Sequence, residues 1–354
     1  PLRWSPPCGF SQGRSMSDFF ELTLGAVFIL SLGLVLYLTP LARKAAISFG
    51  VLDSPDGKLK RHKEPTPYLG GVAVYLAFLI SLGMVFDFDK ELLGMLLGGT
   101  IVTMLGLFDD LRVLTPGLKI MGQLLAIWVL FKSGATIQIA SLPAWATLLL
   151  TVIWVVVVTN AVNILDVSDG VASGTAAIAA LSLTVIALLN GRPLIASAAL
   201  ALAGSCAGFA WFNKAPARIY LGDTGSMFIG FMLASLTMIG DYAANNSLAL
   251  LAPLFILFVP LFEVAICSLA RISKGKSPLQ GSPDHQAIRL KNRNISAARA
   301  AQIIWGFQWV GGSIGIGLVV VGPESAWMIL SAGCMFFVGL LIWFFIYAKA
   351  PSWE

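Results

Sequence analysis

Long uninterrupted apolar runs limit most strongly what this chain can fold into. Of its 354 residues, 57% are hydrophobic and only 12% are charged, whereas soluble domains carry roughly 25% charged residues. Runs of about 20 apolar residues match the helix length needed to cross a ~30 Å hydrocarbon core. A membrane β-barrel would instead alternate apolar and polar residues in segments of about ten. The sequence therefore predicts an all-α, polytopic bundle of transmembrane helices.

We predict about eleven membrane spans, with ten as the alternative because two of them are short. No soluble domain interrupts them, so residues 16–354 are expected to form a single transmembrane domain. Residues 1–15 precede Met16 and lack a starting methionine, and we expect them to be a non-native or disordered extension. The predicted spans are 20–42, 69–86, 92–108, 117–131, 144–163, 171–189, 194–212, 224–240, 248–270, 298–321 and 325–347.

The basic residues predict the orientation of these spans. With the N-terminus outside, eighteen of the 23 lysines and arginines fall in cytoplasmic segments, mainly in loops 43–68 and 271–297. This positive-inside bias favours that orientation over its reverse. The formal charge of +5 therefore reflects membrane topology, and we expect no nucleic-acid partner. The cysteines Cys206, Cys267 and Cys334 lie in apolar runs without metal-type spacing, so we predict that they are small buried hydrophobic residues.

Acidic residues gather at the predicted cytoplasmic ends of several spans. Ionisable groups at membrane depth are costly and usually functional. The predicted outer segments also contain acids, but no cluster of acids with amides and glycines. Candidate chemistry is therefore confined to one face. The acids on that face are Asp109, Asp110, Asp166, Asp169 and Asp223.

The first candidate motif is the pair Asp109-Asp110, followed by Lys119. Adjacent helical residues point about 100° apart, so the two acids suit separate tasks, such as a metal or base contact and a supporting contact. A solvated acidic pair balanced by Arg112 is the alternative for this dipeptide alone.

The second motif places four polar side chains, Asn160, Asn163, Asp166 and Asp169, after a strongly apolar run. A three-residue spacing puts them on one helix face. Unpaired polar groups at membrane depth are expensive, so this row predicts either a binding site or a polar packing seam.

The third motif is the turn 222–226, Gly-Asp-Thr-Gly-Ser, which opens a predicted span. Glycines allow close backbone approach to a ligand, and the free N–H groups of a helix N-terminus attract phosphate. Asp223 suits Mg²⁺, which takes one or two carboxylates together with phosphate oxygens. Helix capping by Asp223 or Thr224 is the alternative.

The two basic loops carry the only histidines, His62 and His285. Each could equally be structural, and the bases could serve only topology or anionic lipid. Carboxylates for Mg²⁺, bases for phosphate charge and amides for a polar headgroup together indicate phosphoryl transfer, which depends mainly on positioning and charge neutralisation.

These motifs, in this order, resemble those of the polyprenyl-phosphate N-acetylhexosamine-1-phosphate transferases, glycosyltransferase family 4. The resemblance runs from about residue 20 to the end of the chain and includes the Pro-Asp-Gly, histidine and Gly-Gly features of loop 53–71. It implies transfer of a sugar-1-phosphate, such as N-acetylglucosamine-1-phosphate, from a UDP-sugar to undecaprenyl or another polyprenyl phosphate, with release of UMP. The expected location is the bacterial inner membrane, with the active site facing the cytoplasm.

The resemblance also implies roles for individual residues. Asp223 would bind Mg²⁺, for which Mn²⁺ could substitute, and Asp109 and Asp110 would be the catalytic pair. A homodimer is the oligomer we consider. The residues implied in substrate binding are Lys119, Asn160, Asn163, Asp166, Asp169, Asn213, Tyr220, His285 and Arg289.

Two departures from the family pattern concern sugar specificity. The sequence reads Asp166-Val167-Ser168-Asp169-Gly170 where the family has Asp-Gly-x-Asp-Gly. In the later loop only His285 is kept, with Ala287 and Ile288 in place of two further histidines. This pattern favours the N-acetylglucosamine-type branch over the phospho-N-acetylmuramoyl-pentapeptide transferases, which stay the alternative.

The mechanism expected from these residues is direct attack of the carrier phosphate on the β-phosphorus, because no activated serine or cysteine lies near the motifs. A covalent intermediate on Asp109 or Asp110 is the alternative. A secondary transporter is the reading from another class, but transporters tend to place polar sites near the midplane, often between repeats. An inactive relative is the third reading, since loop histidines are missing.

Overall fold

A computed structural model describes residues 16–53, 65–84, 88–139, 141–240, 242–277 and 283–348, with side chains from residue 22 onward. The predicted extension 1–15 and the loop with His62 lie outside these ranges.

The regular structure of the described chain is helical apart from one two-stranded antiparallel ladder, β1 (Leu52–Asp53) with β2 (Thr66–Pro67). The prediction of an all-α fold is confirmed, and each predicted span overlaps a helix. The helices are α1 (Met16–Ser48), α2 (Gly70–Gly83), α3 (Lys90–Leu111), α4 (Pro116–Ser133), α5 (Ala144–Leu165), α6 (Val171–Leu189), α7 (Pro193–Asn213), α8 (Gly222–Met238), η1 (Tyr242–Ala244), η2 (Ser247–Leu251), α9 (Ala252–Ile256), α10 (Phe258–Ile272), α11 (Gln286–Lys291), α12 (Ala297–Val320) and α13 (Pro323–Ile346).

Eight helices of the described chain are long and apolar enough to cross a membrane, or nine if one bent pair counts as a span. They make the chain an integral membrane protein of several spans. The difference from the predicted eleven arises at three places. Helix α2 has only 14 residues, and α4 contains Lys119, Gln123 and Lys132 within its 18 residues. The third is the bend between α9 and α10.

The segment predicted as one span at 248–270 is bent by 73° between Ile256 and Phe258. Pro260 cannot donate a hydrogen bond to the carbonyl of Ile256, four residues earlier, so a continuous helix is disfavoured here. Gln308 of α12, fully buried, donates to the Ile256 carbonyl at 2.6 Å and accepts from the Val259 N–H at 3.2 Å. One side chain therefore satisfies backbone groups on both sides of the break.

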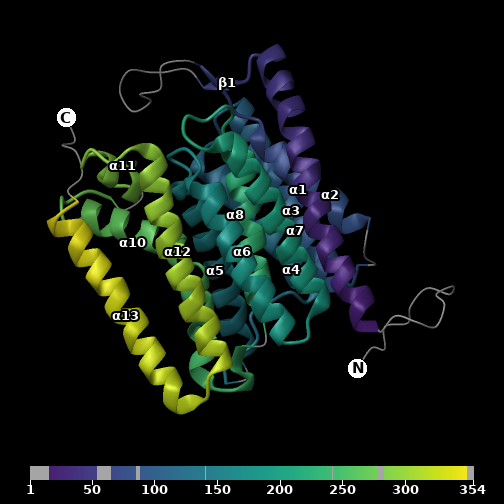
Figure 1. Ribbon diagram of the computed structural model, residues 1–354, viewed down its shortest axis with the longest axis vertical. Helices are drawn as coiled ribbons and strands as arrows, with labels where there is room; N and C mark the ends of the chain where they lie inside the picture. The colour runs from purple at the N-terminus through teal and green to yellow at the C-terminus, as the bar shows by residue number, and fades with distance from the viewer. Residues whose placement is uncertain are drawn as a thin grey trace.

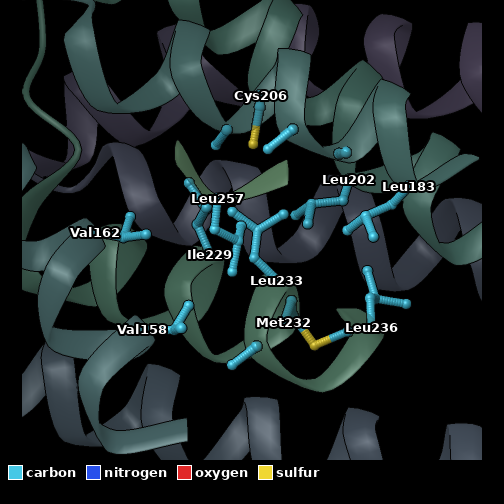
Figure 2. Close-up of a cluster of buried hydrophobic side chains, with 14 of the residues drawn as sticks. Val158, Val162, Leu183, Leu202, Cys206, Ile229, Met232, Leu233, Leu236 and Leu257 are labelled. Atoms are coloured by element: carbon cyan, nitrogen blue, oxygen red, sulfur yellow. The ribbon is translucent and has the colours of Figure 1, made fainter. Parts of the chain in front are cut away.

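Helix α8 forms the centre of the bundle. All its residues from Thr224 to Met238 are buried, as expected of a helix that is apolar on every side. Figure 2 shows Ile229 and Leu233 of α8 among side chains from α5, α6 and α7. Because α8 is enclosed by its neighbours, its N-terminus has a fixed place at one end of the bundle.

The two ends of the bundle differ in what they carry. Figure 1 shows β1 and α11 at one end, and the start of α1 (purple) at the opposite end. The β-ladder connects to the start of α8, because the Tyr220 N–H donates to the Pro67 carbonyl at 2.8 Å. The candidate residues are built around this end.

Candidate active site

The starts of α2 and α8 lie against each other. The N–H groups of Gly70 and Gly71 donate to the carbonyls of Tyr220 and Leu221 at 3.0 and 2.8 Å. A Cβ added to Gly225 would lie 2.6 Å from the Cα of Gly71. Gly225 therefore allows helix packing, a use of small residues typical of membrane bundles, whereas the sequence had suggested close approach to a ligand.

Asp110 binds the N-terminus of α8. Its carboxylate accepts hydrogen bonds from the N–H groups of Asp223 and Thr224 at 2.8 and 3.0 Å, and from the Thr224 hydroxyl at 2.6 Å. The prediction that free N–H groups here would hold phosphate is corrected, because these two already bind a carboxylate. Neither residue of the turn caps the helix with its own side chain; the cap comes from α3, and the negative charge also matches the helix dipole.

Gly222 makes this capping arrangement possible. Its φ of +73° is one that other residues rarely adopt, and a Cβ there would lie 2.6 Å from an Asp110 carboxylate oxygen. A side chain at position 222 would therefore prevent Asp110 from reaching the N–H groups at the start of α8.

Asp109 points to a different partner, as predicted for adjacent helical acids. Lys119 of α4 forms ion pairs with Asp109 at 2.5 Å and with Asp223 at 2.7 Å. The other oxygen of Asp223 accepts from the Asn163 amide at 2.9 Å, and that amide also donates to Ser226. Four elements, α3, α4, α5 and α8, thus converge on Asp223.

Asn160 lies one turn deeper than Asn163 on the same face of α5. Its amide donates to Gln123 of α4 at 3.0 Å. The Gln123 side chain is 1% exposed, and its own amide nitrogen is a buried donor with no partner in the described structure. The polar seam and the candidate site are therefore one continuous row.

Helix α5 ends at Leu165, so the predicted row does not stay helical to Asp169. Asp166 follows the last helical residue. Burial, and then the negative charges of Asp223, Asp110 and Asp169, raise the pKa of Asp166 well above its usual range. Asp169 accepts from the Ala217 N–H at 3.0 Å. Burial and the neighbouring carboxylates therefore both disfavour the charged form of Asp166.

Asn213 and Tyr220, implied as nucleoside contacts, differ in exposure. Asn213 is 1% exposed. Its oxygen accepts from Gly170 N–H and the Ser173 hydroxyl, and its amide donates to the Ile219 carbonyl. Through these bonds Asn213 connects the start of α6 to the segment that precedes α8. Tyr220 is half-buried.

The later basic loop supplies His285 and Arg289. His285 Nδ1 lies 2.8 Å from a carboxylate oxygen of Glu263. Arg289 is 3% exposed, pairs with Asp284 at 3.3 Å, and donates to the carbonyls of Phe344 and Ala348 at 3.2 Å. In this conformation Arg289 connects the loop to the end of α13.

Several residues of the site were not identified from the sequence. The sequence did not show that the Thr224 hydroxyl donates to Asp110, that Glu263 pairs with His285, or that Lys291 of α11 donates to the Ser168 hydroxyl at 3.3 Å. Their partners lie 22 to 123 residues away in the chain, so only the fold reveals these pairings. Glu263, an acid in the middle of an apolar run, was the one visible signal.

The carboxylates fit a hard divalent cation such as Mg²⁺. Lys119 pairs with both Asp109 and Asp223, and burial, followed by the negative charges of Asp223, Asp110 and Asp169, raises the pKa of Asp166. Among the described residues these acids do not form a compact three-ligand group. Such a site matches Mg²⁺, which takes one or two carboxylates and completes its shell with substrate phosphates and water.

Comparison with known proteins gives consistent matches. The profile described as glycosyl transferase family 4 matches residues 92–241. The chain is 30% identical to the probable undecaprenyl-phosphate N-acetylglucosaminyl 1-phosphate transferase of Bacillus subtilis, over 89% of each chain. The decaprenyl-phosphate N-acetylglucosaminephosphotransferase of Mycolicibacterium smegmatis is 31% identical over 78% of this chain and 76% of its own. A phospho-N-acetylmuramoyl-pentapeptide-transferase of Trichormus variabilis is 30% identical over 67% and 70%, respectively.

Proposed function

The chain belongs to glycosyl transferase family 4, the polyprenyl-phosphate N-acetylhexosamine-1-phosphate transferases, and from this premise we propose the reaction that it catalyses. It transfers a sugar-1-phosphate, N-acetylglucosamine-1-phosphate in the leading assignment, from a UDP-sugar to a polyprenyl phosphate and releases UMP. The relatives named above, which act on undecaprenyl and decaprenyl phosphate, support the lipid acceptor.

The convergence on Asp223 carries the proposal. Its backbone is held by Asp110, and its carboxylate by Lys119 and Asn163. A carboxylate fixed by two donors is pre-organised, and pre-organised charge accounts for much of the catalysis of phosphoryl transfer.

In the proposed reaction, an oxygen of the carrier phosphate attacks the β-phosphorus of the UDP-sugar. The new oxygen–phosphorus bond forms as the bond from the β-phosphorus to the bridging oxygen breaks, and that oxygen leaves with UMP. Asp223 and Asp166 are the residues proposed to hold Mg²⁺, which when bound would neutralise the diphosphate charge. Lys119 would supply positive charge to the phosphates, and Asp109 would orient Lys119.

Direct attack and a covalent aspartyl-phosphate are separated by a trapping experiment. Enzyme incubated with β-³²P-labelled UDP-sugar in the absence of lipid acceptor stays unlabelled if attack is direct. An acyl phosphate is cleaved by hydroxylamine and by base, so label on Asp109 or Asp110 that hydroxylamine removes is the outcome that would reject direct attack.

The active site is proposed to face the cytoplasm of a bacterial inner membrane. The bias of the basic residues supports this orientation, and Figure 1 shows β1 and α11 at the same end of the bundle. Val113, 95% exposed beyond α3, is a suitable reporter. In a cysteine-free background, Val113→Cys should react with an impermeant maleimide only in inside-out vesicles, and Ser141→Cys, between α4 and α5, only in right-side-out vesicles. The reverse pattern would reject the orientation.

A UMP-release panel tests the reaction and the donor. We expect release from UDP-N-acetylglucosamine that requires undecaprenyl phosphate, and little from UDP-muramoyl-pentapeptide, because the loop keeps only His285 of the histidine motif. Preference for the pentapeptide donor would reassign the branch. Uptake of an intact UDP-sugar into vesicles that contain the protein, without UMP release, would support a secondary transporter instead.

A further inference from the structure

Glu263, Cys267 and His285 form a compact group apart from the carboxylates described above. Glu263 and Cys267 lie one helical turn apart on α10, and His285 immediately precedes α11. One Glu263 oxygen lies 2.8 Å from His285 Nδ1 and 3.8 Å from Cys267 Sγ, and that sulfur lies 3.7 Å from Nδ1. The three groups therefore present one oxygen, one sulfur and one nitrogen to a common point.

These separations are close to those of a tetrahedral zinc site. Zinc bond lengths to oxygen, nitrogen and sulfur imply ligand-to-ligand distances of about 3.4 to 3.6 Å. The two sulfur distances in the protein, 3.7 and 3.8 Å, are about 0.2 Å longer than this. Only the 2.8 Å separation between Glu263 and His285 would have to open, by about 0.6 Å. A change of this size requires small side-chain rotations and no movement of α10.

The surroundings also suit a bound cation. Glu263 and Cys267 are each 1% exposed, whereas the His285 side chain is 13% exposed, which provides a route of entry from one side. The second Glu263 oxygen accepts from the Gln286 N–H at 3.2 Å. Such supporting hydrogen bonds orient ligating carboxylates in metal sites.

We propose that Glu263, Cys267 and His285 bind a borderline divalent metal of the Zn²⁺ class, with the fourth position open to water or another ligand. Binding releases the Cys267 thiol proton to solvent and requires a neutral His285 with its ring proton on Nε2. The carboxylate and thiolate charges then balance the ion. Thiolate and imidazole ligands select such metals over Mg²⁺, so this site is chemically distinct from the carboxylates around Asp223.

The site ties the basic loop to α10, so that metal binding should stiffen the loop carrying α11. This inference does not depend on the proposed reaction. Cys206 and Cys267 are buried, as the sequence predicted, whereas Cys334 is exposed on the surface of α13 and the prediction of burial was wrong for it. The proposal gives Cys267 a ligand role in addition to its buried position. The separation of Cys267 and His285 by a loop explains why no short motif marked the site.

Cobalt substitution tests the proposal directly. Purified full-length protein in detergent is titrated with Co²⁺, with a sulfur-to-cobalt charge-transfer band as readout, and then with Zn²⁺. We expect one sulfur-bound Co²⁺ per chain, a charge-transfer band that Zn²⁺ abolishes, and loss of the band in Cys267→Ser. The variants Cys8→Ser, Cys206→Ser and Cys334→Ser are matched controls that should keep it.

Glu263→Gln and His285→Gln provide a second measurement should Cys267→Ser fail to fold. We expect Zn²⁺ to raise the melting temperature of the wild type and of Cys334→Ser, but not of these two variants. Absence of the band in the wild type would overturn the proposal. A band that persists in Cys267→Ser, or equal stabilisation of every variant by Zn²⁺, would also overturn it.

Discussion

Replacement of Asp110 tests whether this acid acts by capping α8. Asp110→Ala removes an acceptor for two backbone N–H groups and the Thr224 hydroxyl. Helix caps contribute about 1 kcal/mol, and a charge at a helix N-terminus can add up to about 2 kcal/mol when partly buried. We therefore expect a loss of about 2–4 kcal/mol. Asp110→Asn keeps one acceptor oxygen and should cost about half as much.

Asp89 provides the matched control. It caps α3 by accepting from the Leu92 N–H at 2.7 Å, at the opposite end of the helix that carries Asp110. Asp89→Ala should cost about 1 kcal/mol and leave the turnover of folded enzyme unchanged. Asp110→Ala should lower both the melting temperature and turnover, because Asp223 loses its fixed position.

Thermal unfolding in detergent and UMP release are measured on the same preparations. A double-mutant cycle with Thr224→Val should give a coupling energy of about 1 kcal/mol, since the two side chains share a hydrogen bond. Wild-type stability in Asp110→Ala, together with lost turnover, would refute the capping role and assign Asp110 directly to chemistry. Zero coupling to Thr224 would also refute it.

Three further substitutions test other parts of the account. Gln308→Leu should lower stability by about 2–4 kcal/mol, because it leaves two buried backbone groups at the α9–α10 bend unpaired; exposed Gln302→Leu is the control in the same melting assay. Lys119→Gln should reduce turnover about 100-fold in the UMP assay, and recovery in Lys119→Arg would show that positive charge is what matters. The pKa of Asp166 is raised in the folded protein, so at pH values above the ordinary pKa of an aspartate the folded state binds more protons than the unfolded state. The free energy of unfolding should therefore fall as the pH rises from that ordinary pKa through the raised one. Asp166→Asn should weaken this fall and reduce stabilisation by Mg²⁺; melting curves from pH 5 to 8 that match the wild type would contradict this.

The sequence predicted the helical elements well because apolar length alone identifies a membrane helix. It could not predict the bend at Ile256–Phe258, since a proline is common in membrane helices and the partner Gln308 is 49 residues away from Val259. The number of spans could not be predicted from apolar length either, because α2 and α4 are short and their positions depend on contacts with neighbouring helices.

Within the site, local spacing predicted that Asp109 and Asp110 would have separate partners. It could not show that Asp110 occupies the N-terminus of α8, because that pairing joins positions 113 residues apart. Asn213 and Arg289 were grouped with the substrate contacts through resemblance. Their burial, 1% and 3% exposed, follows from the fold and is invisible in the motif.

UMP release by purified Asp223→Asn, with UDP-N-acetylglucosamine, undecaprenyl phosphate and Mg²⁺ present, is the most direct test of the site. The substitution keeps the size of the side chain and removes the charge on which Lys119 and Asn163 converge. We predict a correctly folded protein that releases no detectable UMP. Release at the wild-type rate would contradict the central role given to Asp223.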